Sequence, residues 1–301
     1  MRHFLHDFDL SAAEQSQILD LALKMKATPD EFRQTLAGKV LGMIFMKSST
    51  RTRVSFEAGM IQLGGSAIFL SSRDIQIGRG EPISDTGEVL SRYLDVIMFR
   101  AFAHADVQAL AAASSVPVIN GLDDYLHPCQ ALADLLTIKE HKGEVAGKQL
   151  VYVGDGNNVA NSLYFAGALA GLNVRVVAPE GYLPETKVLE EASAAASSGA
   201  CMEATSDLAG IEGADIVYSD VWASMGQEEE AKQRLKDFEG YQVDKALFGR
   251  AKNDAIFMHC LPAHRGEEVS AEVIDGPASV IFDQAENRMH AQKALMAFLL
   301  G

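Results

Sequence analysis

The residues with the clearest capacity for chemistry are hydroxyl and guanidinium groups gathered where a helix is expected to begin. The sequence Ser-Thr-Arg-Thr-Arg at residues 49–53 follows an apolar run, and Ser49 or Thr50 would cap the helix. A helix N-terminus offers unpaired N–H donors and a positive dipole end, so with Arg51 and Thr52 it predicts a phosphate cradle. Arginines at a helix N-terminus oppose the helix dipole and destabilise the helix unless an anion is bound. Their presence therefore favours a phosphate cradle over an ordinary capped helix.

A second group lies at residues 123–134, where Pro128 stands at the expected first turn of a helix. The proline keeps His127 out of the α-helical backbone region, which suits a side chain aimed into a binding site, and Gln130 projects from the same helix start. The alternative is a capping histidine beside the buried thiol of Cys129. The residues alone leave both interpretations open.

A third group follows a buried strand expected at residues 255–259, which ends in a histidine and leads into Cys260. Ligands of open α/β sheets bind at the carboxyl ends of strands. A metal site built from His259, Cys260, His264, Glu267 and Glu268 is one interpretation, but the paired spacing of zinc ligands is lacking. Cys260 as a covalent nucleophile is another, although the sequence positions no base beside it.

The turn after the strand expected at residues 149–154 begins like a dinucleotide-binding motif, with Gly154 and Gly156. The third glycine of that motif is absent. Asn157 and Asn158 would crowd a pyrophosphate, but they can hydrogen-bond a carboxylate. A plain strand-to-helix turn is the remaining alternative.

Asp220 follows the strand expected at residues 214–218 and can hold an ammonium group. Ser224, Met225 and Gly226, which come next, are typical of a mobile loop. A helix-capping turn explains the same residues equally well.

The elements that must position these groups follow from an alternation of short apolar runs with longer helical patterns. This alternation predicts an α/β protein whose helices cover both faces of parallel sheets. A polar segment with two glycines at residues 141–148 predicts a domain hinge. Strands are expected near 40–46, 66–71, 95–99, 116–119, 149–154, 173–178, 214–218, 255–259 and 279–283. Helices are expected near 11–26, 51–63, 84–94, 128–141, 159–170, 186–198 and 286–299.

Composition excludes several classes of protein. The 301 residues suffice for two domains, and 26 Lys and Arg against 41 Asp and Glu give a net charge of −15 without a basic run, so nucleic acid is not expected as a partner. The longest apolar runs are too short to span a membrane, and no secretory signal is visible. Cys129, Cys201 and Cys260 form an odd, sparse set, which favours a reducing cytoplasm.

The chain contains six separated motifs: Ser-Thr-Arg-Thr-Arg at 49–53, Phe-Arg-Ala at 99–101, His-Pro-Cys-Gln at 127–130, Asp-Val-Trp-Ala-Ser-Met-Gly at 220–226, His-Cys-Leu-Pro at 259–262 and Asp-Gln-Ala-Glu-Asn-Arg at 283–288. Taken together and in this order, they resemble the ornithine carbamoyltransferases. The resemblance extends from about residue 45 to the C-terminus, and no motif is broken.

The resemblance implies transfer of a carbamoyl group from carbamoyl phosphate to the δ-amine of L-ornithine, without a covalent enzyme intermediate, a metal or a cofactor. The products are L-citrulline and phosphate. It also implies two doubly wound parallel-sheet domains, residues 1–141 for carbamoyl phosphate and 142–285 for ornithine, with a C-terminal helix, 286–301, returning to the first. A homotrimer with sites at subunit interfaces is implied as well.

Residue roles are implied in the same way. Arg100, His127 and Cys260 are the catalytic residues, and Cys260 and the Leu261 carbonyl are partners of the attacking amine. The residues implied to bind carbamoyl phosphate are Ser49, Thr50, Arg51, Thr52, Gln76, Arg100, His127, Gln130, Cys260, Leu261 and Arg288. Those implied to bind ornithine are Asn158, Asp220, Ser224 and Met225.

The loop at residues 71–82 is too long for a simple connection. In the family it reaches the neighbouring subunit's site, which implies that Gln76 approaches the carbamoyl phosphate bound there. A solvated loop without a role is the alternative. Two other functions compete with the transferase: a nicotinamide dehydrogenase built on Gly154 and Gly156, and a catalytically silent anion-binding protein. Enzymes acting on acetylornithine or putrescine are rivals within the family.

Overall fold

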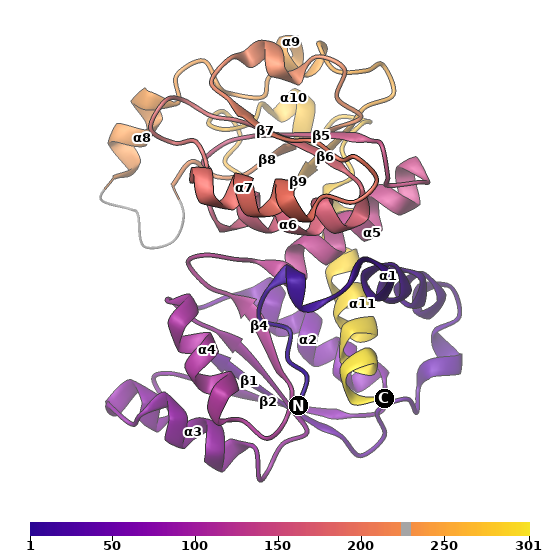
Figure 1. Cartoon of the computed structure of the whole chain (residues 1–301), viewed down its shortest axis with the longest axis vertical. Helices are drawn as coiled ribbons and strands as arrows, with labels where there is room; N and C mark the ends of the chain where they lie inside the picture. The colour runs from indigo at the N-terminus through magenta and orange to yellow at the C-terminus, as the bar shows by residue number, and fades with distance from the viewer. Residues whose placement is uncertain (224–229) are drawn as a thin grey trace. The chain divides into compact units, whose positions relative to one another are not determined.

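The computed structural model describes residues 1–223 and 230–301, which form two compact units (Figure 1). Unit 1 comprises Met1–Leu136 and Glu286–Gly301, and unit 2 comprises Thr137–Ala285. The chain passes from unit 1 to unit 2 within α5 (Pro128–Lys142) and returns within α11 (Ile281–Leu300). The boundary between the two units lies inside α5, between Leu136 and Thr137, and the predicted hinge at 141–148 comes after it.

Unit 1 contains a four-stranded parallel sheet in the order β2-β1-β3-β4. Helices α3 and α4 cover one face, and α2 and α11 cover the other (Figure 1). Ile44, Phe99 and Leu110 are fully buried in the core between the sheet and α4, and burial of each side chain contributes about 1.5–3 kcal/mol. The strands are β1 (Val40–Phe45), β2 (Ser66–Ser71), β3 (Val96–Arg100) and β4 (Val118–Leu122); the helices are α1 (Ala12–Ala27), α2 (Thr50–Gln62), α3 (Ile83–Leu90) and α4 (His104–Ala113), with 3-10 turns η1 (Asp7–Asp9), η2 (Pro29–Phe32) and η3 (Gln76–Arg79).

Unit 2 contains a five-stranded parallel sheet in the order β7-β6-β5-β8-β9. Helices α6 and α7 cover one face, and α9 and α10 cover the other (Figure 1). Val151, Val217 and Phe257 are fully buried in the core under α9 and α10. The strands are β5 (Gln149–Val153), β6 (Asn173–Val177), β7 (Met202–Thr205), β8 (Ile216–Ser219) and β9 (Ile256–His259); the helices are α6 (Asn158–Ala170), α7 (Thr186–Ala195), α8 (Ala231–Asp237), α9 (Lys245–Phe248) and α10 (Ala271–Ile274), with the 3-10 turn η4 (Leu208–Ile211).

The order of strands creates a topological switch point in each sheet, where chain connections leave in opposite directions. In unit 1 the switch lies between β1 and β3, and in unit 2 between β5 and β8. Residues after these strands therefore converge at the carboxyl edge of each sheet. Both switch points carry residues that the sequence singles out.

The predicted α/β class with parallel sheets and a returning C-terminal helix is confirmed, but some predicted elements are wrong. The apolar residues 279–283 form no strand: only Ser279 makes a bridge, to Phe257, and α11 begins at Ile281. The sequence pattern does not predict strand β7, because Met-Glu-Ala-Thr is a short, partly exposed edge without an apolar run. The sequence pattern also does not predict helices α4, α8, α9 and α10. Among the described residues, no helix is long and apolar enough to cross a membrane.

Candidate functional site

The predicted phosphate cradle lies at the N-terminus of α2. Ser49 caps the helix, and its Oγ accepts a hydrogen bond from the Thr52 N–H at 3.2 Å. Arg53 is engaged elsewhere: its Nε lies 3.5 Å from Glu57 Oε2, and its guanidinium stacks 3.8 Å from the centre of the Phe69 ring. Arg51 forms no ion pair with any described residue. Its charge at the positive end of the helix therefore remains uncompensated, as an anion site requires.

Two guanidinium groups converge on the buried Thr52 hydroxyl. Arg100, at the end of β3, donates from Nη1 to Thr52 Oγ1 at 3.4 Å, and Arg288, from α11, donates from Nη2 to the same oxygen at 3.1 Å. All three residues are at least nine-tenths buried. Arg100 Nε is buried without a hydrogen-bond partner among the described residues. The structure thus brings together three residues that the sequence assigned to one ligand.

His127 and Gln130 join this cluster at the start of α5, where Pro128 is the first helical residue. Arg288 Nη1 donates to Gln130 Oε1 at 3.0 Å, and Gln130 Nε2 donates to Asp134 Oδ1 at 2.8 Å. His127 is buried and lies close enough to the arginines for their charges to affect its ionisation.

Like charges at close range lower the pKa values of this cluster. Burial, followed by the charges of Arg288 and Arg51, lowers the pKa of Arg100 to about 9. Burial and the charges of Arg288, Arg100 and Lys47 hold the pKa of His127 well below its ordinary value. His127 is therefore a neutral imidazole at neutral pH, able to donate one N–H bond. A bound anion would relieve the repulsion among the cations.

The loop that leads to His127 is held by a carboxylate that the sequence did not single out for this role. Asp123 is fully buried, and its Oδ1 accepts from the N–H groups of Tyr125 at 2.9 Å and Leu126 at 2.7 Å. Its Oδ2 contacts Asn120 Nδ2 at 2.8 Å and His104 Nδ1 at 2.6 Å. Asp123 therefore fixes the backbone immediately before His127.

Gln76 belongs to unit 1, but its hydrogen bond is to Arg79 and not to the cluster of Thr52, Arg100 and Arg288. It is exposed at the start of η3, and its Oε1 accepts from Arg79 Nη1 at 3.1 Å. The approach of Gln76 to a neighbouring subunit's ligand stays a prediction.

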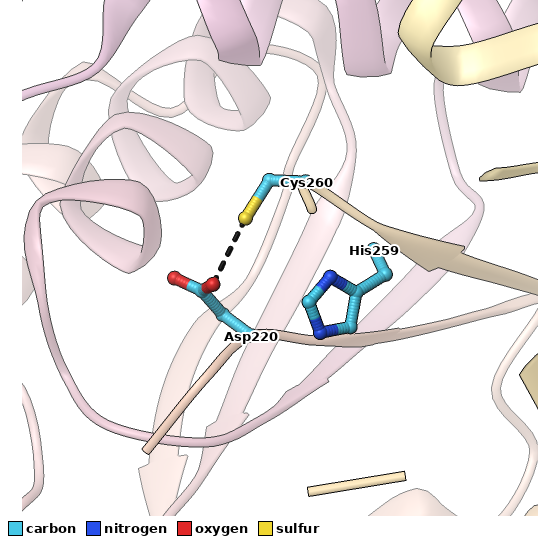
Figure 2. Close-up of side chains that lie close together, drawn as sticks. All are labelled: Asp220, His259 and Cys260. Carbon is cyan, nitrogen blue, oxygen red and sulfur yellow. Dashed lines mark hydrogen bonds between the residues drawn. The ribbon is translucent and has the colours of Figure 1, made fainter. Parts of the chain in front are cut away.

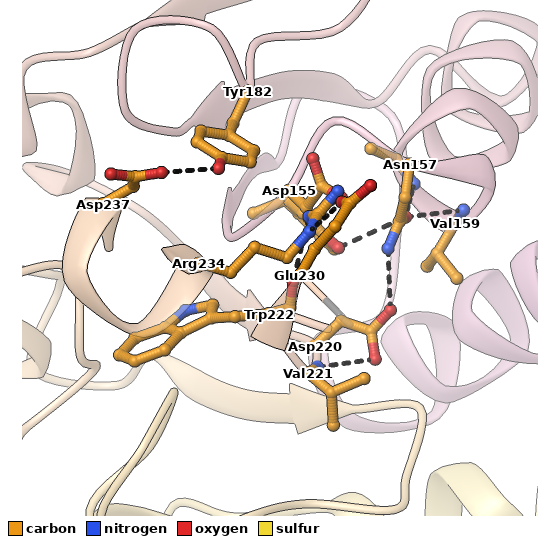
Figure 3. Close-up of polar contacts among 12 residues, drawn as sticks. Asp155, Asn157, Val159, Tyr182, Asp220, Val221, Trp222, Glu230, Arg234 and Asp237 are labelled. Carbon is orange, nitrogen blue, oxygen red and sulfur yellow. Dashed lines mark hydrogen bonds and ion pairs between the residues drawn. The ribbon is translucent and has the colours of Figure 1, made fainter. Parts of the chain in front are cut away.

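Unit 2 carries a second group of polar residues at its own switch point (Figure 3). Asn157 caps α6, its Oδ1 accepting from the Val159 N–H at 2.9 Å, while its Nδ2 donates to Asp220 Oδ2 at 3.1 Å. Asp220 Oδ1 accepts from Cys260 Sγ at 2.9 Å (Figure 2). Asn158, which the resemblance implies to bind ornithine, is the partly buried first residue of α6.

An arginine that the sequence did not single out ties this group to the next helix. Arg234 Nη1 donates to Asp155 Oδ2 at 2.7 Å and to the Trp222 carbonyl at 3.0 Å, and its Nε donates to Glu230 Oε2 at 3.2 Å (Figure 3). Burial is the largest influence on Asp155 and raises the pKa of that carboxyl. The predicted site residues Ser224 and Met225 lie outside the described residues.

Cys260 and Leu261, which the resemblance implies to bind carbamoyl phosphate and the attacking amine, belong to unit 2, where the Cys260 thiol donates to Asp220 Oδ1. His259 offers no free nitrogen for a metal, because Nδ1 accepts from the Leu261 N–H at 2.9 Å and Nε2 faces Glu268 Oε1 at 3.2 Å. The residues of the metal site considered from the sequence do not form one group. Their possible ligand atoms lie in two separate groups, Asp220 with His259 and Cys260, and His264 with Glu267 and Glu268.

The glycines of the turn after β5 have a packing explanation. A Cβ on Gly156 would lie 2.4 Å from the Pro184 nitrogen and 2.7 Å from the Leu183 carbonyl carbon. Only glycine permits this close approach of two backbones. Backbone packing alone therefore explains the second glycine of the dinucleotide-like motif, and no bound cofactor is needed to account for it.

Known proteins resemble the chain over its whole length. A family model described as the carbamoyl-P binding domain of aspartate/ornithine carbamoyltransferase matches residues 2–140, and one described as the Asp/Orn binding domain matches residues 146–299. An ornithine carbamoyltransferase of Oceanobacillus iheyensis is 59% identical, covering 100% of this chain and 94% of that protein. One of Methylococcus capsulatus is 54% identical, with 99% and 98% covered. The solved ornithine carbamoyltransferase of Pyrococcus furiosus matches with a TM-score of 0.96 at 53% identity, covering 100% and 97%.

Proposed function

The chain belongs to the aspartate/ornithine carbamoyltransferase family, and from this premise we propose how its residues carry out the reaction. The enzyme transfers the carbamoyl group of carbamoyl phosphate to the δ-amine of L-ornithine, giving L-citrulline and phosphate. The observation that carries the assignment of the first substrate is the convergence of Arg100 and Arg288 on Thr52 beside the uncompensated Arg51. A phosphate ester is the ligand that such a buried set of cations and helix N–H donors favours.

Unit 1 binds carbamoyl phosphate in this proposal. The N–H groups at the start of α2, the hydroxyls of Ser49 and Thr50, and Arg51 hold the phosphate oxygens, and Arg288 supplies further charge. Arg100, the neutral His127 and the Thr52 hydroxyl donate to the carbonyl oxygen, and Gln130 lies beside them. Negative charge develops on that oxygen when the carbonyl carbon becomes tetrahedral. Each well-placed donor in such a site lowers the barrier by about 3 kcal/mol.

Unit 2 binds ornithine, which supplies the attacking amine. The neutral δ-amine forms the C–N bond at the carbonyl carbon, the C–O bond to phosphate breaks, and the amine's surplus proton passes to the departing phosphate. The Leu261 carbonyl and the Cys260 sulfur accept hydrogen bonds from the amine before attack. No acyl-enzyme forms, because the substrate's own nitrogen is the nucleophile.

The α-amino acid end of ornithine selects the substrate. Asp220, with Ser224 and the Met225 backbone, binds the α-ammonium, and Asn158 binds the α-carboxylate. The charge of Asp220 disfavours aspartate, which carries an additional carboxylate. Putrescine lacks both α-groups and would leave these polar residues desolvated and unpaired.

The setting that we propose is arginine metabolism in the cytoplasm, carried out by a homotrimer whose sites lie at subunit interfaces. Three free thiols are consistent with a reducing compartment, and the exposed position of Gln76 leaves its side chain accessible to a neighbouring subunit. Sedimentation equilibrium measures the assembly directly, and a monomer would contradict this part of the proposal.

Turnover of a panel of amines with carbamoyl phosphate tests the substrate assignment. L-Ornithine is expected to have a kcat/KM at least about 1,000-fold above those of putrescine, N-acetylornithine and L-aspartate, because a site built for polar groups rejects analogues that lack them. Citrulline formation and phosphate release are measured together. Comparable rates with putrescine or N-acetylornithine would place the enzyme in another branch of the family.

A further inference from the structure

Two fully buried side chains lie behind the Cys260–Leu261 segment and take no part in the reaction described above. His259 ends β9, and Glu268 follows the loop nine residues later, with both side chains inaccessible to solvent. Burying a carboxylate is costly unless hydrogen bonds satisfy it. Their partners show what the pair does.

The contacts of His259 determine which of its nitrogens carries the proton. The Leu261 N–H donates to Nδ1 at 2.9 Å, so Nδ1 must present its lone pair. In the neutral ring the proton therefore lies on Nε2, which faces Glu268 Oε1 at 3.2 Å. Glu268 thus holds the imidazole in the one tautomer that can accept from Leu261.

Leu261 requires such a restraint because its backbone is left-handed. Its φ of 59° lies in the left-handed region, which is strained for a leucine relative to the ordinary regions. Glu268 Oε1 also accepts from the His264 N–H at 2.6 Å. One carboxylate oxygen therefore restrains the loop at both ends, through His259 near Leu261 and directly at His264.

The strand side of the pair is equally constrained. The His259 N–H donates to Gln284 Oε1 at 2.8 Å, and Gln284 Nε2 donates to the Tyr218 hydroxyl at 3.1 Å. Immediately after His259, the Cys260 thiol contacts Asp220 (Figure 2). A shift of the imidazole would therefore move the segment that places the thiol and the Leu261 carbonyl.

We propose that Glu268 and His259 are positioning residues, which hold the Cys260 thiol and the Leu261 carbonyl in place for the ornithine amine. This inference rests on the proposed function, in which these two groups accept hydrogen bonds from the amine. The side chains of His259 and Glu268 are both fully buried, so neither is presented to the substrate. Their effect is expected to fall mainly on ornithine, because in this proposal the phosphate group of carbamoyl phosphate is bound by unit 1.

Paired substitutions at Glu268 test the proposal. Glu268→Ala removes the acceptor from both the imidazole and the His264 N–H, and is expected to lower kcat/KM for ornithine about 10- to 100-fold, the usual effect of an orienting partner. Glu268→Gln retains an oxygen acceptor of the same reach and is expected to stay within about 3-fold of the parent. The affinity for carbamoyl phosphate, measured by calorimetry, should change less than about 2-fold in both.

Asp215 offers a matched control in the same unit. It is also a buried carboxylate, accepting from the Gln149 N–H at 3.0 Å and from Lys252 Nζ at 2.8 Å, but it precedes β8 and so lies at the opposite edge of the sheet. Asp215→Ala is expected to lower thermal stability while leaving the ornithine KM and kcat unchanged. Loss of activity in both alanine variants would indicate general destabilisation and would overturn the proposal.

Alkylation of Cys260 reports its position independently of turnover. In a Cys201→Ser background, iodoacetamide should act mainly on Cys260, because Cys129 is buried and its pKa is raised to about 12. Glu268→Ala is expected to speed alkylation several-fold as the thiol leaves Asp220, and Glu268→Gln should restore the parental rate. Glu268→Asp, too short to reach both partners, replaces the alanine variant if that does not fold.

Two results would contradict the positioning role: parental kinetics and alkylation in folded Glu268→Ala, or equal impairment of the alanine and glutamine variants. The parent is assayed first with carbamoyl phosphate and ornithine. A parent that makes no citrulline refutes the proposed function, whereas the alkylation rates still decide whether Glu268 positions Cys260.

Discussion

The polar groups at the two switch points differ in how far they satisfy one another. In unit 1, Arg100 and Arg288 share the Thr52 hydroxyl, and Arg51 forms no ion pair with any described residue. In unit 2, Asp220 is already bonded to Asn157 and to the Cys260 thiol. Unit 1 therefore gains electrostatic stability when an anion arrives, whereas unit 2 must exchange existing hydrogen bonds for bonds to its substrate.

Carboxylates serve both regions as internal supports. Asp123 holds the backbone before His127, and Glu268 holds the segment that carries Cys260 and Leu261. Both are fully buried; Asp123 accepts from two backbone N–H groups and Glu268 from one. The contrast between the regions thus lies in the groups offered to the ligand and not in the means of holding them.

The largest expected effect is that of Arg51→Ala on carbamoyl phosphate. Loss of a charge-assisted phosphate contact is expected to weaken binding about 100-fold, because both the charge and its donors are removed. Arg53→Ala is the matched control from the same helical turn, since its guanidinium is occupied by Glu57 and Phe69. Calorimetry that found equal losses in both variants would invalidate the cradle assignment.

A smaller effect is expected from Asp220→Asn, which keeps the size of the side chain but removes its charge. The ornithine KM should rise about 30-fold because the α-ammonium loses an ionic partner, while carbamoyl phosphate affinity is retained. Asp237→Asn, a change at a partly exposed position of the same unit that weakens the contact with Tyr182, serves as the control. An unchanged KM would mean that Asp220 does not bind the α-ammonium.

Thermal denaturation of the unmodified protein tests the contrast between the two units in how far their polar groups are already satisfied. Inorganic phosphate at about 100 times its Kd should stabilise the protein by about 2.7 kcal/mol, raising Tm by several degrees. Ornithine alone should give a smaller shift at the same concentration, because it must displace bonds that unit 2 already has. A larger shift with ornithine would reverse the contrast between the two regions.

The smallest expected effect concerns His104, whose pKa is raised, chiefly by its hydrogen bond to Asp123. A raised folded-state pKa contributes stability below the ordinary pKa of histidine, and this contribution is lost as pH rises through the folded value. The difference in unfolding free energy between the parent and His104→Gln should therefore shrink by about 1 kcal/mol or less between pH 6 and pH 9. Urea titrations that gave a constant difference would show that the pair has no ionic character.

The sequence predicts well those features that depend on local pattern. The apolar runs that became β1 and β5 and the cap at Ser49 carry their signals in neighbouring residues. The same reasoning fails at residues 279–283, where an apolar run begins a helix. It also fails at Met202–Thr205, where pairing with β6 and not side-chain pattern creates the strand.

The supports of the candidate site depend on tertiary contacts that no local pattern reveals. Asn157 contacts Asp220, because capping of α6 turns its amide toward the end of β8. Arg234 reaches Asp155 only after the chain has passed through β6, β7 and β8. The proton on His259 is likewise assigned by Leu261 and Glu268, through distances that the fold sets.

Isotope transfer from doubly labelled carbamoyl phosphate tests the central claim most directly. With ¹³C in the carbamoyl carbon and ¹⁸O in the bridging oxygen, attack by ornithine on the carbonyl carbon must break the C–O bond. We predict ¹³C in the ureido group of citrulline and ¹⁸O in the released phosphate, observed together by ¹³C and ³¹P nuclear magnetic resonance. Bridging ¹⁸O recovered in citrulline, or ¹³C recovered without citrulline, would contradict direct carbamoyl transfer to the ornithine amine.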